Sequence, residues 1–120
     1  MMRSAGVRGA VLTAALLPLL TAAPGCRSHH MEITVENRTG SAIRLLEVDY
    51  PSASFGADSL AAGGEFHYRI QARGSGPLKV QYTAEDGRQR QDNGPVLAEG
   101  EEGRMEIALL PGGKAEFHSR

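Results

Sequence analysis

The sequence predicts a small all-β domain, an antiparallel β-sandwich of about six or seven short strands, behind an N-terminal export signal. Three observations support this prediction. Apolar and polar residues alternate in short runs, which is the period of a strand with one buried face. The chain has 15 glycines, and glycine-rich turn sequences separate the runs. No long stretch of the mature chain has the period of an amphipathic helix.

The first 25 residues have the three parts of a signal peptide. Residues 1–9 contain arginines and no acidic residue, residues 10–23 are almost wholly apolar, and small residues follow before polarity begins at Arg27. The apolar part is shorter than the roughly 20 residues that a membrane span needs, and it contains Pro18. We therefore expect residues 1–25 to direct export and to be removed.

Cleavage could fall at either of two places. An ordinary signal peptidase could cut after Ala23, although Pro24 would then follow the cut directly. The other place lies between Gly25 and Cys26, the only cysteine of the chain. A thiolate is a strong nucleophile, so a cysteine at this point can accept a lipid as a thioether.

The residue pair Gly25-Cys26 resembles the end of the lipobox of bacterial lipoproteins. The resemblance implies lipid on the Cys26 sulfur and on the new amino terminus, and therefore attachment to a membrane facing the periplasm or the cell exterior. Two alternatives remain: a plain secreted protein with an unused cysteine, and a cytosolic domain translated from Met31.

Removal of residues 1–25 leaves a chain the size of one small domain. Basic and acidic residues nearly balance, 13 against 14, and no basic patch of the kind that binds nucleic acid is present. One cysteine cannot form an internal disulfide, so the domain must rely on its core. Residues 26–30 form a short polar tether. His29 and His30 lack the fixed geometry of a metal site.

The first two expected strands are residues 31–37 and 42–50. In the first, apolar and polar residues alternate without interruption. In the second, the alternation changes phase between Leu45 and Leu46, which predicts a β-bulge or a change of sheet. Residues 37–40 form the turn between them.

Residues 51–64 are expected to form the longest irregular loop, with Leu60 entering the core. Loops on a rigid sandwich often carry binding residues, and exposed aromatic rings there would provide rigid contacts. The alternative is that the rings pack beneath the loop. The candidate binding residues are Tyr50, Pro51, Ser52, Ser54 and Phe55.

The remaining strands follow at short intervals. Residues 65–72 give the clearest alternation, which places Phe66, Tyr68 and Ile70 inward and His67 outward. An Asp-Gly hairpin signal lies at residues 85–87. The other expected strands are residues 78–83, 104–110 and 114–118. Between them, we expect residues 88–92 to form a polar edge strand or a loop and residues 93–95 to form a turn. Residues 99–103 are expected to form a solvated loop.

The strand rhythm of residues 31–118 resembles immunoglobulin-like or fibronectin-like domains of exported bacterial proteins. The resemblance implies a sandwich of two sheets. The signal and the domain together resemble small bacterial lipoproteins of unassigned function.

The motifs of the common hydrolases and metal enzymes are absent from the sequence. His67 and His118 are isolated, and the acidic residues 99–102 lack the ligand spacing of a calcium loop. The sequence therefore predicts no enzyme, no cofactor and no metal. We expect a membrane-anchored, non-catalytic interaction or structural module with an unknown protein partner in the cell envelope. The alternative is a periplasmic domain that binds a small ligand or a carbohydrate through the 51–64 loop.

Overall fold

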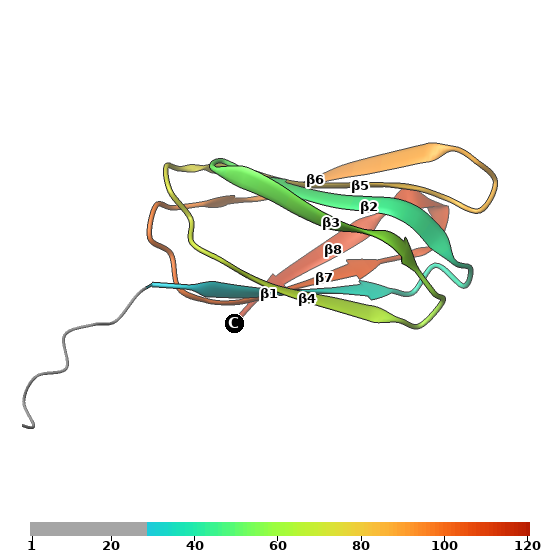
Figure 1. Cartoon of the computed structure of the whole chain (residues 1–120), viewed down its shortest axis with the longest axis horizontal. Coiled ribbons are helices and arrows are strands. Elements are labelled where there is room, and N and C mark those ends of the chain that lie inside the picture. Colours follow the sequence, from blue (N-terminus) through green and yellow to red (C-terminus); the bar gives the residue numbers. More distant parts are fainter. Residues whose placement is uncertain (1–28) are drawn as a thin grey trace, which may run out of the picture.

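A computed structural model describes residues 29–120, so the expected signal peptide and Cys26 lie outside the described residues. In the described part, eight strands form two four-stranded sheets that pack face to face (Figure 1). The predicted all-β sandwich is confirmed. The strands are Met31–Asn37 (β1), Ile43–Tyr50 (β2), Ala53–Leu60 (β3), Glu65–Ile70 (β4), Gly76–Thr83 (β5), Gln89–Leu97 (β6), Gly103–Leu109 (β7) and Ala115–Ser119 (β8).

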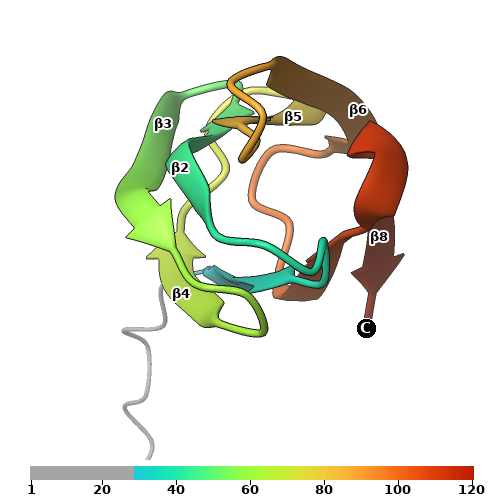
Figure 2. The ribbon, with the colours of Figure 1, turned by 90° about the vertical axis from the view of Figure 1, so that its right-hand side faces the viewer.

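One sheet has the strand order β4-β1-β7-β8 and the other β3-β2-β5-β6. β1 and β7 pair in parallel, whereas the other neighbours pair antiparallel. The view along the strands shows that the edge strands meet across the two sides of the sandwich, with β3 near β4 and β6 near β8 (Figure 2). On each side of the sandwich, an edge strand of one sheet therefore lies next to an edge strand of the other sheet.

The core lies between the sheets and comes from the alternating apolar residues. In β1, the side chains of Ile33 and Val35 are almost completely buried, whereas Glu32 is exposed. Burying one apolar face of each strand is the main source of stability for a domain without disulfides. The other large buried apolar residues are Met31, Ile43, Leu46, Val48, Phe55, Leu60, Ile70, Leu78, Val80, Tyr82, Leu97, Met105, Ile107 and Leu109.

The predicted irregularity at Leu45 is confirmed as a shift in pairing between β2 and β5. Leu45 has a φ of +52° and is 61% exposed, so the following residues change face and Leu46 reaches the core. On the neighbouring strand, a Cβ built on Gly56 would overlap the Leu46 carbonyl oxygen. Glycine at position 56 therefore allows the two strands to approach at this point.

The prediction of an irregular loop over residues 51–64 was wrong. Residues 53–60 form edge strand β3, which pairs with β2 from Tyr50 opposite Ala53 to Ile43 opposite Leu60. The segment is rich in small residues and lacks clear alternation, because an edge strand buries few side chains. Backbone pairing with β2 decides its conformation. Leu60 does enter the core, as predicted.

The predicted turn at residues 93–95 was also wrong, because β6 continues through it to Leu97. Pairing with β5 shifts register there, and an edge position tolerates Pro95 within the strand. A Cβ on Gly94 would come within 2.5 Å of the Phe117 ring of β8, so Phe117 covers the strand at this glycine. Glycine here is a site of close packing between β6 and β8.

Candidate functional site

Four aromatic rings gather where β3 faces β4. We call this group the aromatic edge; it consists of Tyr50 of β2, Phe55 of β3, and Phe66 and Tyr68 of β4. The rings of Phe55 and Tyr68 stack with their centroids 4.4 Å apart and their planes 12° from parallel. Phe55 also lies 6.1 Å from Phe66 and 6.2 Å from Tyr50. The cluster thus joins the two sheets on one side of the sandwich.

Exposure divides these rings into two kinds. Phe55 is only 8% exposed and belongs to the core, whereas Tyr68 is 47% exposed. The prediction that Tyr68 faces the core was therefore only partly right. Its ring packs on Phe55, but β4 is an edge strand and no further strand covers its outer side. Tyr68 is the aromatic residue that this edge presents to solvent.

The five predicted binding residues do not converge on one cavity. Phe55 is buried and cannot be an exposed anchor. Tyr50 is half-buried, and burial, with a smaller contribution from Tyr68, raises the pKa of its hydroxyl. Pro51, Ser52 and Ser54 are exposed, the first two in the tight turn before β3. A binding role for these exposed residues stays a prediction.

Two shallow depressions flank the turn at Pro51 and Ser52. Tyr50 and Pro51 line one of about 530 Å³ together with Lys79 and other residues of the second sheet. Tyr50 and Ser52 line another, of about 580 Å³, together with Tyr68. The structure therefore connects part of the predicted segment with Tyr68, a residue that sequence analysis placed in the core.

Charged and polar side chains occupy the outer face of the β1–β4 pair, whereas Tyr68, opposite Ile33, has the inward phase of its strand. Arg69 Nη2 lies 3.1 Å from Glu32 Oε1 across the β1–β4 pair. Thr34 Oγ1 lies 3.0 Å from His67 Nδ1. His67 is exposed, as predicted.

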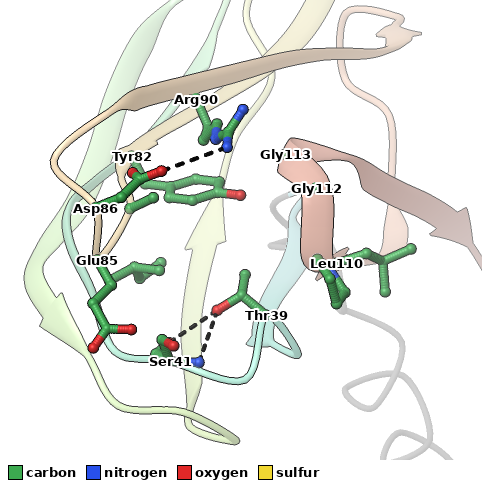
Figure 3. A pocket seen from close by; sticks show the side chains of 12 residues that line it. Thr39, Ser41, Tyr82, Glu85, Asp86, Arg90, Leu110, Gly112 and Gly113 are labelled. Carbon is green, nitrogen blue, oxygen red and sulfur yellow. Dashed lines mark hydrogen bonds and ion pairs between the residues drawn. The ribbon is translucent and has the colours of Figure 1, made fainter.

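A second candidate site lies at the end of the sandwich opposite to where residues 29–31 begin (Figures 1 and 3). It is a pocket of about 240 Å³ between three turns: β1–β2, β5–β6, and the 3₁₀ turn Pro111–Gly113 (η2). We call it the distal pocket. Its lining includes Thr39, Ser41, Tyr82, Glu85, Asp86, Arg90, Leu110, Gly112 and Gly113.

Tyr82 is the most buried of the hydroxyl-bearing residues that line the distal pocket. The residue is 5% exposed, and its hydroxyl points across the pocket toward η2 (Figure 3). Burial is the main cause that raises the pKa of this hydroxyl. Within residues 29–120, no hydrogen-bond partner contacts this hydroxyl. Buried tyrosine hydroxyls usually have such a partner.

Some of the other polar side chains of the distal pocket make contacts of their own. Arg90 Nη2 lies 3.9 Å from Asp86 Oδ2, a loose ion pair. A Cβ on Gly113 would come within 2.9 Å of Arg90 Cδ, so the arginine stem lies directly against η2. The Thr39 hydroxyl donates to Asn37 Oδ1 at 2.7 Å.

Asn37 fixes the turn that carries Thr39 and Ser41. This fully buried side chain donates to the carbonyl oxygens of Ser41, Leu60 and Ala61 at 2.8, 3.0 and 3.1 Å. Its Oδ1 also accepts from the Thr39 backbone N–H at 3.0 Å. The wall of the distal pocket is therefore attached to the β3–β4 turn through one amide group.

Two carboxyl groups lie together on the outer face of the second sheet. Gln81 donates to Glu47 at 2.7 Å and lowers the pKa of that carboxyl. Desolvation, and then the neighbouring Glu47, raise the pKa of Asp49. Lys79 lies 3.9 Å from Asp49. These two carboxyl groups make the stability of the domain depend on pH.

Sequence analysis missed the distal pocket for a topological reason. It identified turns at residues 37–40 and 85–87, but nothing in the local sequence places these two turns and η2 at one end. Tyr82 was part of the expected strand at residues 78–83 and was not singled out. The signal that could have drawn attention to it is its polar hydroxyl in an otherwise apolar inward row.

Within residues 29–120, no group of three or more His, Cys, Asp or Glu side chains is arranged to hold a metal ion. The same part of the chain contains no helix long and apolar enough to span a membrane.

Comparisons with known proteins identify a fold but no family. No family model matches the chain, and no curated protein matches it. The NMR structure of a protein from Eubacterium rectale is similar, with a TM-score of 0.55 and 17% sequence identity, over 76% of this chain and 88% of that one. At this identity the likeness shows the fold alone, a small two-sheet β domain.

Proposed function

We propose that this protein is a small bacterial lipoprotein, exported and anchored through Cys26, whose immunoglobulin-like domain binds a protein partner in the cell envelope. The anchor rests on the signal-like residues 1–25 and on the match of Gly25 and Cys26 to a lipobox. Cys26 lies only a few residues before Met31, where β1 begins. The domain would thus lie close to the membrane surface.

The observation that carries the binding role is Tyr68. Its ring is fixed by stacking on Phe55, yet 47% of the residue is exposed. A ring already held in place loses little conformational entropy when a partner covers it. Tyrosine is also enriched among residues that dominate interface energies.

The alternative function, binding of a small ligand, is favoured by a different observation. The distal pocket gathers polar groups from three turns around the unpartnered Tyr82 hydroxyl. The 51–64 loop that sequence analysis proposed for this role does not exist as a loop, because most of it is β3.

Site-specific photocrosslinking in bacterial cells tests the protein-binding role. A benzophenone amino acid at position 68 of the full chain should give one discrete adduct in the membrane fraction on irradiation. The matched control places the same group at Val96, which is 66% exposed on β6 at the other side of the sandwich. Adducts of equal pattern at both positions, or none at position 68, would remove the aromatic edge as the binding surface.

A further inference from the structure

We propose that the distal pocket is a binding site for a single neutral sugar ring, such as the end residue of a glycan, with the Tyr82 hydroxyl as its central hydrogen-bond donor. This inference concerns a surface distinct from the aromatic edge. It does not depend on the protein partner proposed above.

The first argument is the unpartnered hydroxyl. Tyr82 is 95% buried, as its 5% exposure shows, and its hydroxyl is directed into the distal pocket (Figure 3). Among residues 29–120 this hydroxyl has no hydrogen-bond partner, so its proton is available to an acceptor in the distal pocket. A ligand oxygen in front of Tyr82 would make a hydrogen bond that none of these residues makes.

The second argument is the mixture of donors and acceptors around Tyr82. The Arg90 guanidinium only donates, whereas the carboxylates of Glu85 and Asp86 only accept. Sugar hydroxyl groups both donate and accept, so adjacent hydroxyls on one ring can satisfy both kinds of group. Apolar side chains, including Leu110, line the remaining wall and suit the C–H faces of a ring.

The third argument is charge. Glu85 and Asp86 outnumber Arg90 in the lining, so an anionic ligand would meet more like charge than opposite charge. A cation would find the carboxylates but could not accept the hydrogen bond that Tyr82 offers. A neutral polyhydroxyl compound fits both conditions.

The fourth argument is size and position. The volume of about 240 Å³ lies below the range of roughly 300–1,000 Å³ typical of pockets for drug-sized ligands. A single sugar ring suits a pocket of this volume better than a longer oligosaccharide does. The pocket lies at the end away from residues 29–31 (Figure 1). With the anchor proposed at Cys26, this end would face away from the membrane, where a glycan could approach it.

The test uses the full chain, purified in detergent, and its Tyr82→Phe variant, which removes only the hydroxyl oxygen. The control is Ser59→Ala, which removes an exposed hydroxyl of β3 outside the distal pocket. Methyl glucoside, galactose and N-acetylglucosamine are titrated into the millimolar range, alongside sodium acetate and ethylammonium chloride as an anionic and a cationic probe. Amide chemical shifts of Gly112 and Gly113 report binding, and thermal unfolding reports stability.

We expect at least one sugar to shift these amides in the wild type and in Ser59→Ala, and to bind about two- to tenfold more weakly to Tyr82→Phe. Without sugar, Tyr82→Phe should be as stable as the wild type or more stable, because it removes an unpaired group. The inference is overturned if no sugar binds, if Tyr82→Phe binds the sugar equally well, or if acetate or ethylammonium binds in preference. A clear loss of stability in Tyr82→Phe would also overturn it, since the hydroxyl would then have an internal partner.

Discussion

Replacing Phe55 with alanine should strongly destabilise the domain. The ring is 8% exposed, and it contacts Tyr68 at 4.4 Å and Phe66 at 6.1 Å between ring centroids. Truncation of a buried phenylalanine typically costs about 3–5 kcal/mol, through lost transfer free energy and the cavity that remains. Part of this cost is the loss of aromatic pairs, at about 0.5–1.5 kcal/mol each.

A loss of this size is a large fraction of the roughly 5–15 kcal/mol that stabilises a typical domain. Since 1 kcal/mol lowers Tm by about 4–8 °C in a domain of this size, Phe55→Ala should lower Tm by more than about 12 °C. Urea unfolding followed by circular dichroism, with a thermal scan, measures the change.

Two variants make the result specific to burial. Phe55→Leu retains most of the apolar volume and should cost much less than Phe55→Ala. Tyr68→Ala removes a half-exposed ring and should also cost less than Phe55→Ala. A loss below about 1 kcal/mol for Phe55→Ala, within the range of ordinary surface changes, would show that Phe55 does not lie in the core and that residues 53–60 do not pair as β3.

Three further predictions concern the second sheet. Gly56→Ala should destabilise by about 1–3 kcal/mol, measured by urea unfolding, because its Cβ would overlap the Leu46 carbonyl oxygen; an unchanged midpoint would contradict the close approach. Leu45→Asn should stabilise by about 0.5–1 kcal/mol, since asparagine tolerates the positive φ of Leu45 better than leucine does; a lower Tm would count against it. The pKa of Asp49 is raised, so the folded state binds the proton of this carboxyl more tightly than the unfolded state does. Asp49 therefore adds to the stability of the fold below its ordinary pKa of 3.8. That contribution is lost as the pH rises through the raised pKa. Asp49→Asn should therefore be more stable than the wild type at pH 7 and lose that advantage in acid, and equal stability at both pH values would refute the assignment.

Alternation was sufficient to predict those strands that bury one complete face. β1 and β5 follow the alternation of their apolar residues, and Leu45 marked the bulge because two successive apolar residues cannot face the same side of a regular strand. In these segments local sequence and burial give the same answer, so the pattern was informative.

The edge strands could not be predicted in the same way. β3 buries few residues, and its small side chains favour no single conformation, so pairing with β2 determines it. Tyr68 has the inward phase of its strand but remains half exposed, since exposure there depends on β4 being at an edge. The distal pocket depends on three turns meeting at one end, which only the topology determines.

Labelling with palmitate tests the proposed anchor at Cys26 most directly. The full chain and its Cys26→Ser variant are expressed in a bacterial host supplied with labelled palmitate, and the label on each chain is measured after membrane fractionation. We predict that the wild type carries the label and sediments with membranes, and that Cys26→Ser loses both properties. An unlabelled wild type released in the same soluble fraction as Cys26→Ser would contradict the proposal of a lipid-anchored envelope protein.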